Sequence, residues 1–148
     1  MNLHHLKLAT VYVLALLYVV VGVKHFTDTA FFLSIMPPYL PFHRELVWIS
    51  GAFEILFGVG LVFKQTRRYA AFGILLLLLA VFPANIHLAM SETAQEALGA
   101  SQTDALIRLP FQIPLLLFAW WHGQETTARW FSVLCLVLFV PTVVYFVT

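Results

Sequence analysis

The stretch SGAFEILFGVG, residues 50–60, places one carboxylate, Glu54, inside a run of apolar side chains and glycines. It belongs to a longer apolar segment, residues 46–63, that is long enough to cross a bilayer as a helix. Ionisable side chains are costly in lipid, and by default they face the interior of a helix bundle and mark function. Glu54 therefore raises two questions: which helices surround it, and what its carboxylate serves.

The composition of the whole chain indicates a membrane protein. Of its 148 residues, 61% are hydrophobic and only 10% are charged, whereas soluble domains average about 45–50% and about 25%. We therefore expect the lipid bilayer to be its main partner. The net charge of +1 gives no reason to expect nucleic acid. The single cysteine, Cys135, excludes an internal disulfide and a CxxC pair.

The hydropathy pattern predicts one transmembrane domain over residues 1–148, with an all-α integral membrane fold. The five segments expected to span the membrane are residues 6–26, 46–63, 69–90, 105–121 and 130–146. The first connection, residues 27–45, is apolar but interrupted by prolines. We predict a short helix there, followed by an extended PPYLP segment at the membrane interface or folded back over the bundle. The polar loop before the fourth span is predicted to hold a short surface helix.

The positive charges predict the orientation of these helices. The densest cluster is KQTRR, residues 64–68, which connects the second and third spans and is expected on the cytoplasmic side. By alternation the N-terminus is also cytoplasmic, and the PPYLP segment lies outside. Four spans then bring polar side chains to the outer half of the membrane. At about 1.5 Å of rise per residue, Glu54 lies roughly 12 Å below the outer surface.

These polar side chains form the candidate site. Its predicted members are Lys24, His25, Glu54, Asn85, His87, Arg108 and Gln112. Gly51 and Gly58 share the helix face of Glu54 by i, i+3, i+7 spacing, so a neighbouring helix is expected to approach that face closely. Tyr18, Gly22 and His25 share a face of the first span by the same rule.

Each member also has a structural interpretation. Glu54 either pairs with Arg108 or Lys24 to hold the helices together, or it serves a ligand or a proton. Lys24 is expected to extend to the lipid headgroups. Asn85 and Gln112 are expected to join helices by hydrogen bonds.

Several short motifs resemble the DoxX-like family of small bacterial membrane proteins. They are KHF after the first span, IMPPYLP in the loop, SGAFEI in the second span, FPANI in the third and RLPFQ at the start of the fourth. The resemblance covers about residues 20–121. It implies a four-helix transmembrane bundle in a bacterial inner membrane, to which the segment after Arg129 adds a fifth, C-terminal transmembrane helix. It also implies a redox-associated role.

Four functional hypotheses remain open. In the first, an accessory redox protein binds a quinone or another small apolar ligand through His25, Arg108 or Gln112, and Glu54 exchanges protons with it. Its partner is a membrane redox subunit or another copy of the chain. In the second, His25 and Glu54 are the acid–base pair of an enzyme acting on a lipid-soluble substrate. In the third, His25, His87 and Glu54 hold a metal or haem. In the fourth, the cluster is purely structural, and the outer loop binds a partner protein.

Overall fold

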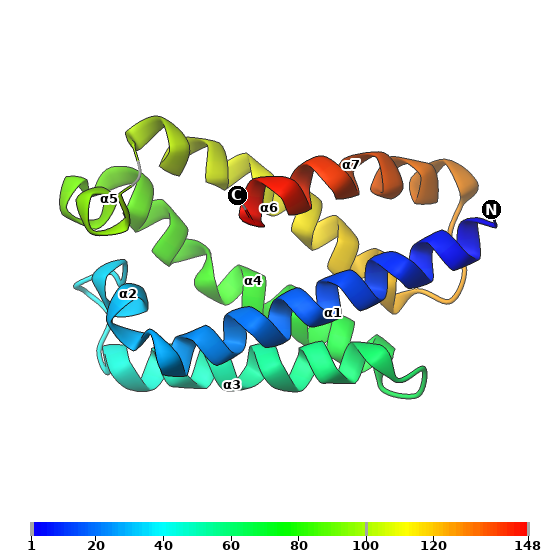
Figure 1. Cartoon of the computed structure of the whole chain (residues 1–148), viewed down its shortest axis with the longest axis horizontal. Coiled ribbons are helices and arrows are strands. Elements are labelled where there is room, and N and C mark those ends of the chain that lie inside the picture. Colours follow the sequence, from blue (N-terminus) through cyan, green and yellow to red (C-terminus); the bar gives the residue numbers. More distant parts are fainter. Residues whose placement is uncertain (1, 100, 148) are drawn as a thin grey trace.

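The computed structural model describes residues 2–99 and 101–147, and within these ranges it contains helices and no strand. The helices are α1 (Leu3–Thr27), α2 (Thr29–Ser34), α3 (His43–Val62), α4 (Arg67–Met90), α5 (Glu92–Leu98), α6 (Gln102–Gly123) and α7 (Arg129–Val147) (Figure 1). The predicted all-helical bundle is confirmed. The short helix predicted in the proline-containing connection is α2, and the one predicted in the polar loop is α5.

Among the described residues, four helices are long and apolar enough to cross a membrane: α1, α3, α4 and α7. The predicted span at residues 105–121 lies within α6, which is not among them, so a fifth transmembrane helix is not supported. Within the predicted span, Arg108, Gln112 and the two prolines, Pro110 and Pro114, lower the mean hydropathy of a helix that is otherwise long enough. The added C-terminal helix, α7, does meet the requirement.

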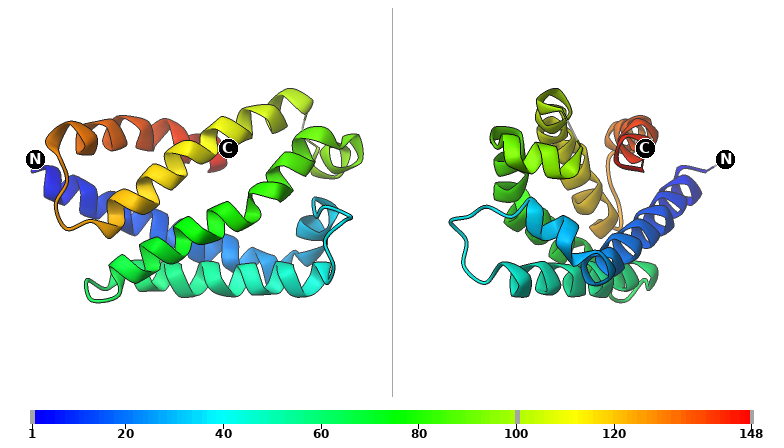
Figure 2. Two further views of the ribbon diagram at one scale, coloured as in Figure 1. Left: turned by 180° about the vertical axis from the view of Figure 1, so that it is seen from behind. Right: turned by 60° about the vertical axis from the view of Figure 1, so that its left-hand side comes forward.

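The long helices associate in pairs. Helix α1 packs along α3, and α4 packs along α6, while α7 lies against α6 and α1 (Figures 1 and 2). The short helices α2 and α5 contact each other at one end of the bundle, which we call the α2/α5 end. The N-terminus, the α3–α4 turn and the α6–α7 connection lie at the opposite end, which we call the basic end because it contains Lys7 and residues 64–68.

The contact between α1 and α3 depends on glycine. A Cβ atom added to Gly22 would lie 2.7 Å from the carbonyl oxygen of Gly51, and one added to Gly51 would lie 2.5 Å from the Cβ of His25. Farther along α3, a Cβ on Gly58 would lie 2.9 Å from the carbonyl oxygen of Ala15. Side chains at these positions would separate the helices, so glycine is what permits their close approach. The prediction that a helix approaches the Gly51–Gly58 face is confirmed, and that helix is α1.

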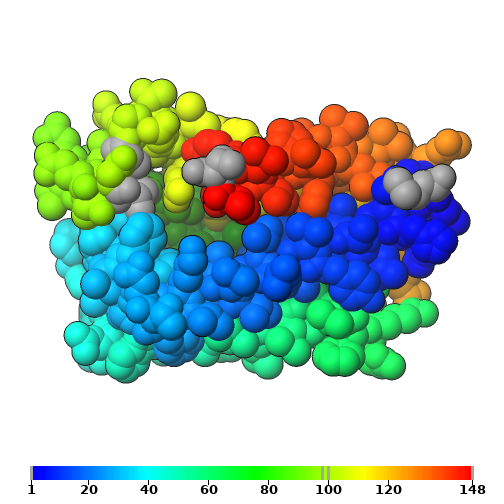
Figure 3. Space-filling view, viewed as in Figure 1, coloured from blue at the N-terminus to red at the C-terminus, as the bar shows by residue number. Residues whose placement is uncertain are grey.

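The apolar core is continuous only towards the basic end. There, Val11 of α1, Leu61 of α3, Ile74 of α4 and Ala119 of α6 belong to one buried cluster. A second cluster joins α6 to α7, and a third lies beneath α5, between α4 and α6. On the face shown in Figure 3 the molecule is hollowed between α1 and α7, and α4 forms the floor of the hollow. The two helix pairs thus meet in a shared core at one end and diverge towards the other.

The glycine contact makes a direct prediction about stability. Gly51→Leu should lower the free energy of unfolding by about 1–3 kcal/mol or more, because the new side chain has no space between α1 and α3. Unfolding in mixed detergent micelles, followed by circular dichroism, measures this change. The matched control is Ala52→Leu, one residue along on an exposed face of α3, which should alter stability by less than about 0.5 kcal/mol. Equal stability of the two variants would contradict the packing described.

Candidate functional site

The α1–α3 contact brings His25 and Glu54 together. Nδ1 of His25 lies 3.3 Å from Oε2 of Glu54, and their side chains are only 9% and 13% exposed. The same nitrogen lies 2.9 Å from the carbonyl oxygen of Val21, one turn earlier in α1. Because a carbonyl only accepts, Nδ1 carries a hydrogen and donates it to Val21. The imidazole and the carboxyl group are thus in close contact without a hydrogen bond between them.

Helix α2 covers this pair on one side. The ring of Phe32 stacks on the ring of His25, with centroids 3.6 Å apart and planes inclined by 22°. Thr29, at the start of α2, donates a hydrogen bond to the carbonyl oxygen of His25 and accepts one from the indole of Trp48 on α3. The predicted short helix after α1 therefore packs over His25 and helps to hold it in place.

Two buried oxygens at this contact lack partners. Within the described part of the chain, Oε2 of Glu54 and the hydroxyl of Tyr18 are buried and make no hydrogen bond. Tyr18 lies on the same face of α1 as Gly22 and His25, and its Cβ is beside Gly58 of α3. An unsatisfied buried polar group costs about 1–3 kcal/mol, and such groups are rare enough in native proteins to need an explanation. Tyr18 therefore joins His25 and Glu54 as a site residue.

Asn85 and Gln112 form a separate polar contact between α4 and α6. Nδ2 of Asn85 donates to Oε1 of Gln112 over 2.7 Å, and Nε2 of Gln112 donates to the carbonyl oxygen of Leu78 over 2.5 Å. Gln112 is buried, and both ends of its amide are satisfied within the protein. This contact joins the two helices, as the structural interpretation of these residues predicts.

The remaining predicted members lie apart from Glu54. Lys24 is exposed, and the guanidinium of Arg108 lies over the ring of Phe146, 5.9 Å from its centroid. Neither cation pairs with Glu54, whose ion-pair contact among the described residues is with His25. His87 is half-buried on α4. In the described ranges, no three His, Cys, Asp or Glu residues are grouped so that they could hold a metal ion, so His25, His87 and Glu54 form no such set.

Four of the seven predicted side chains thus form two contacts on different helix pairs, and Lys24, His87 and Arg108 belong to neither. Sequence reasoning placed Tyr18 on the correct face but did not include it in the site, although its spacing from Gly22 and His25 was the available signal. It also treated residues 64–68 only as an orientation signal. In the structure they border a cavity at the basic end.

Comparison with known proteins gives one match. A family model described as Domain of unknown function (DUF8561) matches residues 14–123, roughly three quarters of the chain. The matched region includes Tyr18, His25 and Glu54, and it ends before α7. No curated protein and no solved structure matches the chain.

The α4–α6 contact can be tested by a double-mutant cycle. Asn85→Ala and Gln112→Leu should each destabilise the protein, and the coupling between them should be about 0.6 kcal/mol, the average for interhelical hydrogen bonds in membranes. Gln112→Leu should be the more harmful, because it also removes the bond to Leu78. Unfolding in mixed micelles measures both. Gln102→Leu, at an exposed position of the same helix, is the matched control, and purely additive effects at 85 and 112 would count against the contact.

Proposed function

This chain belongs to the family described as Domain of unknown function (DUF8561), and from that premise we propose that it binds a small apolar ligand with hydrogen-bonding oxygens, such as a quinone. Because the family assigns no activity, the proposal rests on the site. We place the protein in a bacterial inner membrane with its N-terminus in the cytoplasm. Four apolar helices support insertion into a membrane, and the positive charge of residues 64–68 supports the orientation.

The observation that carries the proposal is the pair of unpartnered oxygens on Tyr18 and Glu54. The two groups suit both redox forms of a quinone. The hydroxyl of Tyr18 donates to a quinone carbonyl, whereas the hydroxyl of a quinol donates to the carboxylate of Glu54. The carboxyl group would exchange protons with the ligand, while electrons would pass through a separate redox partner. This assigns the chain an accessory role in membrane redox chemistry, in keeping with the DoxX-like resemblance.

We take the hollow on the side of the bundle as the route of the ligand. The hollow between α1 and α7 opens on the side of the molecule, where apolar helices would face lipid (Figure 3). A ligand dissolved in the bilayer would enter there without crossing water. Binding would also satisfy buried polar groups that otherwise cost stability.

Two alternatives rest on observations of their own. The 3.3 Å approach of His25 to Glu54 also suits an acid–base pair acting on a lipid-soluble substrate. The glycine contacts favour a purely structural role, because they already hold α1 against α3. A measurement of quinone binding distinguishes the ligand-binding proposal from the structural alternative. A measurement of product formation by the purified protein distinguishes the ligand-binding proposal from the enzymatic alternative.

The proposal predicts that Tyr18→Phe and Glu54→Gln each weaken binding of a short-chain quinone by roughly tenfold, because each variant removes one hydrogen bond of about 1–1.5 kcal/mol. Equilibrium titration of the purified protein in lipid nanodiscs measures the affinity. The control is Thr142→Val, which removes a buried hydroxyl that bonds to Leu138 within α7. That variant should bind as the wild type does.

Two results would contradict the proposal. One is that the wild-type protein shows no saturable quinone binding. The other is that both site variants keep wild-type affinity while losing stability, which is the outcome that the structural alternative predicts.

A further inference from the structure

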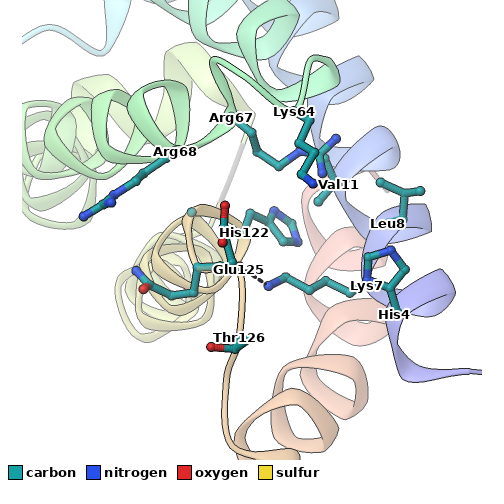
Figure 4. Close-up of a pocket in the computed structure, with 12 residues that line it drawn as sticks. His4, Lys7, Leu8, Val11, Lys64, Arg67, Arg68, His122, Glu125 and Thr126 are labelled. Atoms are coloured by element: carbon teal, nitrogen blue, oxygen red, sulfur yellow. Dashed lines mark hydrogen bonds between the residues drawn. The ribbon is translucent and has the colours of Figure 1, made fainter.

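The basic end contains a cavity of about 440 Å³ that we call the basic cavity (Figure 4). The charged and histidine side chains that matter here are Lys7, Lys64, Arg67, Arg68, His122 and Glu125. They come from α1, from the α3–α4 turn with the start of α4, and from the end of α6 with the chain after it. Four of the eight Lys and Arg residues of the chain thus line one cavity, together with a single carboxylate.

The positive charge of this cavity is not neutralised inside the protein. Among the described residues, none of its four cations has a carboxylate within 4 Å. Lys7 donates to the carbonyl oxygen of Gln124 over 2.6 Å, and Arg67 donates to the carbonyl oxygens of Leu61 and Val62 at the end of α3. These bonds fix the positions of two cations without cancelling their charge. Crowded like charges repel each other, so a bound anion would stabilise the arrangement.

The other two cations have free donors. Within the described part of the chain, the side chains of Lys64 and Arg68 are exposed and make no hydrogen bond or ion pair. In Figure 4, Arg68 extends away from Lys7, Lys64 and Arg67. Lys64 thus offers free donors on the side of Lys7 and Arg67, and Arg68 offers them on the other side, where it also lines a second cavity.

One wall of the cavity is fixed by a buried histidine. The hydroxyl of Thr10 donates to the carbonyl oxygen of Lys7 over 2.7 Å, so its oxygen is left to accept from Nε2 of His122 over 3.0 Å. His122 is only 2% exposed. This chain of bonds ties the end of α6 to α1 and gives the cavity a rigid boundary.

Membrane orientation alone does not require this arrangement. The positive-inside rule concerns how many Lys and Arg residues lie in short loops and near the ends of spans. It does not require Lys7, from the start of the chain, to line the same cavity as residues 64–68. The convergence of these side chains is a property of the fold.

A second cavity, of about 570 Å³, adjoins the first and shares Arg68, Gly123 and Gln124 with it. The rest of its lining is mostly apolar and includes Phe72 and Leu75 of α4 and Trp120 of α6. Phe72 is 62% exposed and Trp120 is 46% exposed, so this apolar cavity is open to the surroundings of the bundle. A cationic cavity that continues into an apolar one matches an amphipathic anion.

We propose that the basic cavity binds the phosphate of an anionic phospholipid, one acyl chain of which lies in the adjoining apolar cavity. Basic pockets between helices on the cytoplasmic side of a membrane recognise phospholipid headgroups in this way. A free phosphate shares the headgroup's chemistry but does not account for the apolar cavity. The site is at the end of the bundle opposite α2 and is independent of the ligand proposed for Tyr18 and Glu54.

The test uses the full-length protein in a neutral detergent and measures thermal unfolding during titration with four probes. They are dioleoyl phosphatidylglycerol, dioleoyl phosphatidylcholine, glycerol 3-phosphate and sodium phosphate. The wild type should be stabilised at the lowest concentrations by phosphatidylglycerol. The double variant Lys64→Gln with Arg68→Gln should weaken this effect by roughly 30-fold, because each basic residue near a membrane surface contributes roughly fivefold.

The matched control is Lys24→Gln with Arg129→Gln, which removes the same two residue types from exposed positions that do not line the cavity. It should shift the phosphatidylglycerol titration by less than about twofold. Stabilisation by glycerol 3-phosphate or sodium phosphate as strong as that by phosphatidylglycerol would overturn the lipid assignment and identify a soluble phosphate site. The site itself would be overturned if phosphatidylglycerol and phosphatidylcholine stabilised the wild type equally. It would also be overturned if both double variants lost the same amount of stabilisation by phosphatidylglycerol.

Discussion

The close approach of α1 and α3 at Gly22, Gly51 and Gly58 is the contact on which the rest of the structure depends. Because these positions lack side chains, the two backbones meet, and His25 of one helix comes within 3.3 Å of Glu54 of the other. The same approach encloses a carboxylate that would otherwise face lipid. Glu54 is thus enclosed by the packing of α1 against α3. Lys24 and Arg108, the cations considered as its partners, lie elsewhere.

The bundle has two chemically different ends. Towards the basic end, α1, α3, α4 and α6 share one apolar core, and four cations gather around a cavity that opens to the surface. Towards the α2/α5 end, the helix pairs diverge, and Asn85 bonds to Gln112 within one pair, whereas Oε2 of Glu54 and the hydroxyl of Tyr18, in the middle of α1, have no hydrogen-bond partner among the described residues. The basic cavity and the two unpartnered oxygens thus lie in different parts of the bundle, and our two ligand proposals rest on them separately.

Apolar segment length predicted most of the helices, and helical periodicity placed Gly51, Glu54 and Gly58 on a face that contacts another helix. The cost of polar side chains in a membrane indicated that Asn85 and Gln112 join helices by hydrogen bonds. Periodicity shows which residues share a helix face, but it does not show which other helix packs against that face. Seven polar side chains at similar depth were therefore grouped into one cluster. Length and overall apolarity also suggested a span at residues 105–121, whereas the polar residues and prolines of α6 exclude it from the candidate spans.

The most direct test of the account is an experimental map of the purified protein in lipid nanodiscs, at a resolution that shows ordered ligands. We expect Nδ1 of His25 beside Glu54 and non-protein density within hydrogen-bonding distance of both Glu54 Oε2 and the hydroxyl of Tyr18. The contrary result is a map in which these two oxygens bond to protein groups and no density lies beside them. In that case the α1–α3 contact would be structural alone.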